Sequence, residues 1–332
     1  MAISIEDIKK LRAMTGAGLA DVKKALTEAE GDYEKAKELI RERGLAIAAK
    51  RSDRETSNGC VLVKQVDGFA AMVAIKCETD FVANGQDFIA LVQEILDAAV
   101  ANKCKSLDEV KTLKLANGED AATAVQQRSG VTGEKMELDG YNFLEGENIS
   151  VYDHMNKHTL ATIVQLNENN EEAGHKVAMQ VAAMQPVALD EASIPQSVKD
   201  EEFKVAVEKT KEEQIEKAVV AAIKKAGINA NLVDSEDHIE SNIKKGWLTR
   251  EEADKAIEIR NTVAAEKAAN LNEDMIQNIA KGRLNKFFKE NCLVDQEFQF
   301  GDGDKQSVSE WLKAQSKDLK IVAYKRFTLA AE

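Results

Sequence analysis

One short segment combines residue types that suit binding to another protein. Glu78, Thr79 and Asp80 place three polar or charged side chains directly before the aromatic ring of Phe81. A polar run beside one aromatic residue is typical of an exposed loop that offers a single anchor to a partner. The competing interpretation is that Phe81 caps a helix expected to begin near Asp87, since aromatic rings favour protein cores. The polar neighbours favour the exposed loop.

Motifs for catalysis and for cofactor binding are missing elsewhere in the sequence. There is no G-x-x-x-x-G-K-S/T phosphate loop, and Gly16-Ala17-Gly18 is too short for a dinucleotide fingerprint. The stretch Gly301-Asp302-Gly303-Asp304 lacks the spacing and closing Glu of a calcium loop, so we predict a surface turn there. His154 and His158 have the i, i+4 spacing of a metal pair, but no third ligand joins them. We predict no metal, no cofactor and no enzyme activity.

The composition narrows the class of protein. A chain of 332 residues with 44% hydrophobic content can form more than one packed unit. Its formal charge of -13 would repel a phosphate backbone, so we predict no direct nucleic-acid partner. No apolar run approaches the roughly 20 residues that cross a bilayer, and the start lacks a signal pattern, so we expect a cytoplasmic protein that binds no membrane. The four cysteines form no CxxC pair and are expected to be reduced.

The segment at 78–82 follows a predicted hairpin. Residues 60–66 and 69–77 are rich in Val, Ile and aromatic residues around the turn dipeptide Asp67-Gly68. Phe88, Leu91, Val92 and Ile95 then recur at helical spacing. The same order of two strands and a helix recurs at residues 149–152, 159–166 and 177–182, and residues 297–300 and 321–329 return to strand character. We predict a duplicated α+β core.

Two helical regions flank this core. Near the N-terminus, Leu19, Val22 and Leu26 form one apolar stripe of a three-helix module, and Gly44 is a predicted C-cap. Residues 199–286 are rich in Ala, Glu and Lys and predict a protruding helical hairpin whose bend lies at 227–247. The predicted domains are 1–55, the three-helix module and linker; 56–147, the core N-subdomain; 148–198 with 283–332, the core C-subdomain; and 199–282, the helical insert.

Two motifs resemble the elongation factor Ts family. Residues 11–18, Leu-Arg-Ala-Met-Thr-Gly-Ala-Gly, followed by residues 21–26, Asp-Val-Lys-Lys-Ala-Leu, resemble its N-terminal signature. Residues 76–83, Lys-Cys-Glu-Thr-Asp-Phe-Val-Ala, resemble its central motif, whose core is Thr-Asp-Phe-Val. Weaker matches extend the similarity over most of the chain, and the order of elements is the same.

The resemblance implies a fold, a partner and a set of contact residues. It implies an N-terminal module like a ubiquitin-associated domain, two related core subdomains and a coiled-coil excursion that is a candidate dimerisation surface. The implied partner is the GTPase elongation factor Tu, from which such a factor promotes GDP release. The implied site residues are Thr79, Asp80, Phe81 and Val82 beside the magnesium ion, with Arg12, Leu19 and Ala20 of the N-terminal module and His154 of the second hairpin as further contacts.

Some features leave other interpretations open. Leu19 fits both a partner contact and the core stripe of the three helices. The turn at His154 departs from the Gly-rich basic turn usual in the family, and the sequence leaves the role of residues 228–247 open. A helical adaptor that binds peptides through residues 1–45 is the alternative function, and it would leave the 79–82 motif without a role.

Overall fold

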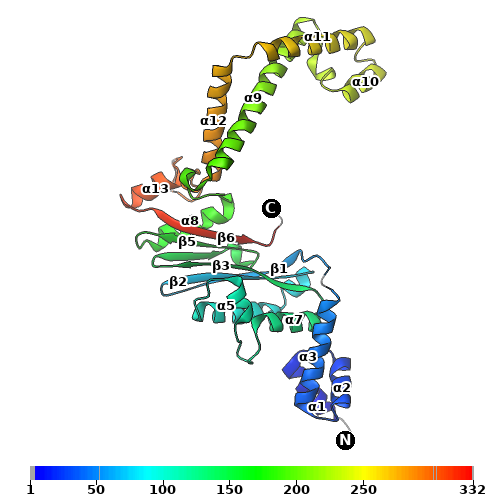
Figure 1. The fold of residues 1–332 in the computed structure, drawn as a ribbon, viewed down its shortest axis with the longest axis vertical. Helices are drawn as coiled ribbons and strands as arrows, with labels where there is room; N and C mark the ends of the chain where they lie inside the picture. Colours follow the sequence, from blue (N-terminus) through cyan, green and yellow to red (C-terminus); the bar gives the residue numbers. More distant parts are fainter. Residues whose placement is uncertain (1–3, 52, 302, 304, 331–332) are drawn as a thin grey trace. The chain divides into compact units, whose positions relative to one another are not determined.

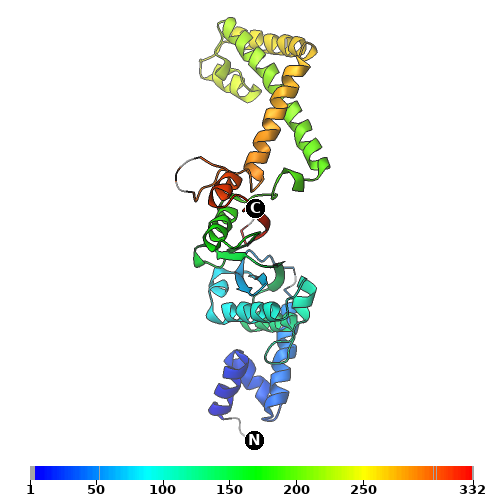
Figure 2. The same cartoon turned by 90° about the vertical axis from the view of Figure 1, so that its left-hand side faces the viewer.

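The computed structural model describes residues 4–51, 53–301, 303 and 305–330 (Figures 1 and 2). The chain divides into two units: Met1–Leu189 together with Gln296–Glu332, and Asp190–Asp295 between them. The first unit mixes helices with two antiparallel sheets and the second is helical among its described residues, so the predicted α+β class is confirmed. Among the described residues, no helix has the length and apolar character to span a membrane.

The first sheet is built on the predicted hairpin. Gly68 adopts φ +68°, the left-handed conformation that the tight turn requires, and Val66 pairs with Phe69 across it. A third strand, absent from the sequence prediction, pairs with the second one. The strands are β1 (Asn58–Val66), β2 (Phe69–Cys77) and β3 (Met136–Glu145). The helices between β2 and β3 are α4 (Asp80–Ala83), α5 (Gln86–Ala101), α6 (Leu107–Thr112) and α7 (Ala121–Thr132).

The second sheet joins distant parts of the chain. Its strands are β4 (Ile149–Asp153), β5 (Leu160–Leu166) and β6 (Ile321–Thr328), accompanied by α8 (Glu171–Met184) and α13 (Val308–Gln315). The prediction that the last strand rejoins this sheet is confirmed, because Leu166 pairs with Ile321. The strand predicted at 297–300 is wrong: only an isolated bridge from Glu297 to Ser307 forms. The turn predicted at 301–304 includes Asp302 and Asp304, which lie outside the described residues.

The two sheets pack face to face, with helices on their outer faces (Figure 1). Met72, Ala74 and Ile163 are buried between the sheets. Phe88, Val92 and Ile95 of α5 fill the space between the first sheet and its helices, and α8 covers the second sheet. Alternate residues of β2 therefore serve two different cores, which explains why this strand is almost continuously apolar.

The N-terminal helices form a small core of their own. They are α1 (Ile5–Thr15), α2 (Leu19–Glu28) and α3 (Tyr33–Ala49). Ser4 and Asp7 form a capping box at the start of α1, and Leu11, Val22 and Leu26 are fully buried. The stripe prediction is wrong for Leu19, which is 57% exposed at the first position of α2.

A close helix crossing explains why α3 continues past its predicted end. Gly44 is an interior residue of α3 rather than its C-cap, and it faces Gly130 of α7. A Cβ atom built on Gly130 would lie 2.3 Å from the Cα atom of Gly44. The two backbones thus touch without side chains between them, and tertiary packing overrides the helix-ending tendency of Gly44.

The second unit is an antiparallel helical assembly with a small core. Its longer helices are α9 (Gln196–Lys225), α10 (Glu236–Lys244), α11 (Arg250–Ala269) and α12 (Glu273–Asn291). Lys199 near the start of α9 lies over the Phe288 ring near the end of α12, and Lys211 further along α9 pairs with Glu273 at the start of α12, so the two helices run side by side in opposite directions. The predicted bend contains the short 3-10 helix η3 (Ala230–Leu232) and α10, and Val233 and Ile239 of the bend are buried in one cluster with Ile223 of α9. The role of the helical insert in dimerisation stays a prediction.

Candidate functional site

The four residues of the central motif lie in one helical turn instead of the predicted loop. Thr79 is the N-cap of α4, and its hydroxyl oxygen accepts a hydrogen bond from the Val82 backbone N–H at 3.4 Å. The backbone N–H of Ala83 donates to the Thr79 carbonyl oxygen at 3.1 Å. Asn84 is the C-cap of α4, and its side-chain amide donates to the Asp80 carbonyl oxygen at 2.8 Å.

This turn separates its side chains into an inner and an outer set. Val82 and Ala83 pack against the core beneath the first sheet, whereas the Phe81 side chain is 87% exposed. The interpretation of Phe81 as a helix cap is therefore wrong. No hydrogen bond or ion pair holds the Asp80 carboxylate among the residues that the structure describes. A carboxylate and an aromatic ring thus project from a base that is anchored in the core.

Two glutamates fix the base of this turn from different directions. The Glu78 carboxylate accepts the backbone N–H of Lys135 at 2.6 Å and faces the Arg54 guanidinium at 3.1 Å. The Glu134 carboxylate accepts both the N–H and the hydroxyl of Thr79, at 3.1 and 2.6 Å. The contacts of these two glutamates were not predicted from the sequence.

The electrostatics around the turn follow from these contacts. The Lys135 N–H and the Arg54 guanidinium lower the pKa of Glu78, so this carboxyl stays ionised. Burial raises the pKa of Cys77 to about 12, so its thiol stays protonated. The Cys77 thiol donates to the Thr79 carbonyl oxygen at 3.2 Å and thereby satisfies a backbone acceptor of the turn. Neither group has the environment of an acid, base or nucleophile at neutral pH.

The predicted contacts of the N-terminal module lie on a separate helical surface. Arg12 is exposed in the last turn of α1, and Leu19 and Ala20 are exposed at the start of α2. Met14 nearby is 53% exposed, so it adds an apolar side chain that the sequence prediction missed. An exposed Met beside a helix start gives no distinct sequence signal, because the same residue type also fills cores.

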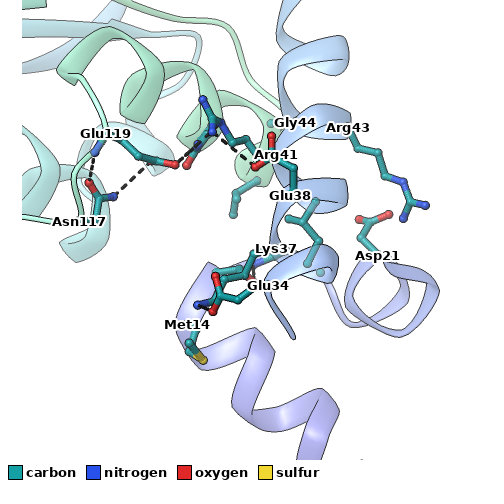
Figure 3. Close-up of a pocket in the computed structure, with 17 residues that line it drawn as sticks. Met14, Asp21, Glu34, Lys37, Glu38, Arg41, Arg43, Gly44, Asn117 and Glu119 are labelled. Carbon is teal, nitrogen blue, oxygen red and sulfur yellow. Dashed lines mark hydrogen bonds and ion pairs between the residues drawn. The ribbon is translucent and has the colours of Figure 1, made fainter. Parts of the chain in front are cut away.

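A cavity of about 420 Å³ lies between this module and α7 (Figure 3). Its charged side chains pair mostly with each other: Lys37 with Glu34 at 2.7 Å, and Arg41 with Glu38 and Glu119 at 3.5 and 3.9 Å. Charges of both signs that already pair leave no converging field for a charged ligand. The cavity therefore does not resemble an enzyme site.

His154 lies in the turn between β4 and β5, within the short 3-10 helix η1 (His154–Asn156). Its Nδ1 atom lies 3.3 Å from the Tyr152 hydroxyl, whereas His158 is hydrogen-bonded to the Asp153 carboxylate. The two histidines thus have different partners. Within the described ranges, no group of three or more His, Cys, Asp or Glu side chains could hold a metal ion. The most exposed apolar side chain of the turn is Met155, at 65%.

Comparison with known proteins first defines the class. The family model described as "Elongation factor TS" matches residues 78–235 and 220–331. The chain is 60% identical to elongation factor Ts of Parabacteroides distasonis, 59% to that of Phocaeicola vulgatus and 40% to that of Porphyromonas gingivalis. Each alignment covers 100% of both chains. The class is that of translation elongation factors.

The chain belongs to the elongation factor Ts family. The resemblance found in the two sequence motifs is thereby confirmed over the full length.

Proposed function

We propose that this protein binds the GDP form of elongation factor Tu and accelerates GDP release, without catalysing a covalent reaction. The observation that carries the proposal is the Asp80-Phe81 pair: the ring is 87% exposed, yet the turn beneath it is fixed by Glu78, Glu134 and the core contacts of Val82. A rigid element that exposes a large apolar ring in water is suited to insertion into a partner.

Insertion of this pair would act on the nucleotide through its magnesium ion. GTPases hold GDP with backbone amides around the phosphates and with Mg²⁺, which demands near-octahedral oxygen ligands at short distance. Burial of one Phe ring supplies about 1.5–3 kcal/mol, which can drive a local rearrangement of the pocket. The adjacent Asp80 carboxylate then disturbs the polar groups that support the ion. Release and binding are linked, so bound GDP weakens the factor by the same ratio as the factor weakens GDP.

Other surfaces would hold the two proteins together. We assign docking to Arg12, Leu19 and Ala20 of the N-terminal module and to the turn that carries His154. Val82 receives a supporting role, because its side chain packs inward. The charge of -13 disfavours a nucleic-acid partner, and we propose that the protein works in the cytoplasm, where translation takes place.

The test is release of a fluorescent GDP analogue from purified elongation factor Tu, measured by stopped flow. The wild-type chain is compared with Asp80→Ala, Phe81→Ala and the control Val187→Ala, which truncates another exposed apolar side chain, 72% accessible, in the same unit. We expect acceleration by the wild type and by Val187→Ala. Loss of about 1.5–3 kcal/mol of ring burial predicts a rate about 10- to 150-fold lower for Phe81→Ala.

Each outcome has a defined meaning. Equal rates for Phe81→Ala and Val187→Ala would show that the exposed ring is not the active element. A folded wild-type chain that leaves the release rate unchanged would refute exchange activity and favour the adaptor function of residues 1–45.

A further inference from the structure

We propose that Glu134 is the positioning residue of the Asp80-Phe81 pair, so that the turn after α7 sets the exchange rate without touching the GTPase. This inference rests on the proposed function. Glu134 lies outside the central motif by more than fifty positions in the sequence, yet its carboxylate is hydrogen-bonded to the residue immediately before Asp80.

The contact with Thr79 uses both oxygens of the carboxylate. One oxygen accepts the Thr79 hydroxyl at 2.6 Å and the other accepts the Thr79 backbone N–H at 3.1 Å. Because the hydroxyl proton is directed to Glu134, the lone pairs of the same oxygen are free to accept the N–H of Val82. Glu134 thus fixes the rotamer of the N-cap and, through it, the first turn of α4.

Glu134 is itself held by the end of α7. Gly133 adopts φ +77° as the C-cap, and its N–H donates to the Ser129 carbonyl oxygen at 2.9 Å. The buried Ser129 hydroxyl donates to the Glu134 carbonyl oxygen, and the Glu134 N–H donates to the Thr132 hydroxyl oxygen at 3.3 Å. The backbone of Glu134 is therefore fixed on both sides before its side chain reaches Thr79.

The same turn also holds the residue before Thr79. The Lys135 N–H donates to Glu78, so two consecutive residues after α7 bind two consecutive residues before Asp80. This antiparallel pairing continues the ladder of β2 and β3, in which Cys77 pairs with Met136. Side-chain carboxylates replace backbone carbonyls where the strands diverge, and the exposed pair is held at the end of a rigid sheet.

The expected effect is on rate more than on affinity. A disordered α4 leaves the docking residues Arg12, Leu19 and Ala20 intact, so the half-saturating concentration of the factor should change less than about 3-fold. Loss of charge-assisted hydrogen bonds at a partly exposed site should lower the maximal release rate about 3- to 30-fold. A variant that merely unfolds would lower the active concentration instead and leave the rate at saturation unchanged.

The experiment measures GDP-analogue release over a range of factor concentrations for the wild type, Glu134→Ala, Glu134→Gln and Glu172→Ala. Glu172 is an exposed glutamate on α8 that pairs with Lys176 in the next turn, so it is the matched control. The glutamine can accept one Thr79 hydrogen bond and should restore part of the maximal rate. Hydrogen exchange of the amides in residues 79–83 of the free protein should accelerate in Glu134→Ala and stay unchanged in Glu172→Ala.

The outcomes separate this proposal from the function on which it rests. A lowered maximal rate for Glu134→Ala, with partial rescue by Glu134→Gln and faster exchange in α4, supports the positioning role. A full maximal rate for Glu134→Ala overturns it and leaves the exchange function standing. No acceleration by the wild type overturns both.

Discussion

The crossing of α3 and α7 predicts opposite effects for two substitutions of the same kind. A Cβ atom at Gly130 would lie 2.3 Å from the Gly44 Cα atom and 2.8 Å from the Gly44 carbonyl carbon and oxygen. Backbone atoms cannot rotate away, so the helices must separate. A Cβ atom at Gly44 would instead lie 3.7 Å from its nearest neighbour, the Gly130 Cα atom, which is ordinary van der Waals contact.

The size of the difference follows from two opposing effects. Replacing Gly by Ala inside a helix stabilises it by about 0.5–1 kcal/mol, and this gain applies to both positions. Overpacking costs about 1–3 kcal/mol and applies only to Gly130. The two alanine variants should therefore differ by about 1–3 kcal/mol in the local opening free energy of the crossing, which is about 5- to 150-fold in an opening equilibrium.

Native-state hydrogen exchange of the α3 and α7 amides measures this opening. We expect faster exchange in Gly130→Ala and unchanged or slower exchange in Gly44→Ala. Gly282→Ala in α12 is the control, since a Cβ atom there meets nothing within 4 Å and only the helix gain remains. Equal protection of the crossing in Gly44→Ala and Gly130→Ala would refute the close approach of the two backbones.

Three further predictions concern exposure. Phe81→Ala should change the free energy of unfolding by no more than about 0.5 kcal/mol, whereas Phe88→Ala, at a side chain only 1% exposed, should lower it by about 3–5 kcal/mol. Urea unfolding measures both values, and similar losses in the two variants would contradict the difference in burial. Iodide should quench the fluorescence of only one of the two tryptophans, because Trp247 is 64% exposed and Trp311 is 4% exposed. Trp247→Phe should abolish this quenching. Strong quenching in that variant would show that Trp311 is accessible to iodide. Burial raises the pKa of Cys60 to about 12, so a thiol reagent at pH 8 should label this cysteine slowly in the folded chain and fast in the unfolded chain. Labelling of the folded chain should become faster as the pH rises. Prompt labelling of Cys60 in the folded chain at pH 8 would count against its burial.

Local signals made one part of the fold predictable. The β1–β2 hairpin depends on a turn dipeptide and on two neighbouring apolar runs, all within 20 residues, so Phe69–Cys77 was predicted at its observed bounds. By contrast, β3 alternates buried and half-exposed positions irregularly and contains Gly140, so its strand character comes from pairing with β2. The helix α7 contacts both α3 and the first sheet and therefore lacks a single apolar stripe.

The candidate site divides in the same way. The exposed ring of Phe81 was deduced from its polar neighbours, because an aromatic residue in a charged segment has little apolar company nearby. The helical conformation of residues 79–82 was not deduced, because the turn depends on the Thr79 cap and on the contact of Val82 with the core. Glu134 gave no signal beyond following the helix-ending Gly133, and only the tertiary fold brings it to Thr79.

The pairing of β5 with β6 has a consequence for the order in which a nascent chain can fold. The strand β5 emerges from the ribosome long before Ile321–Thr328, so one edge of the second sheet stays unpaired while the entire helical unit is synthesised. The helical unit favours the later closure of this sheet, because α9 and α12 run antiparallel and Lys199 lies 5.9 Å from the centroid of the Phe288 ring. Once this helical pair forms, the chain that separates β5 from β6 is effectively much shorter, and closing the sheet costs correspondingly less entropy.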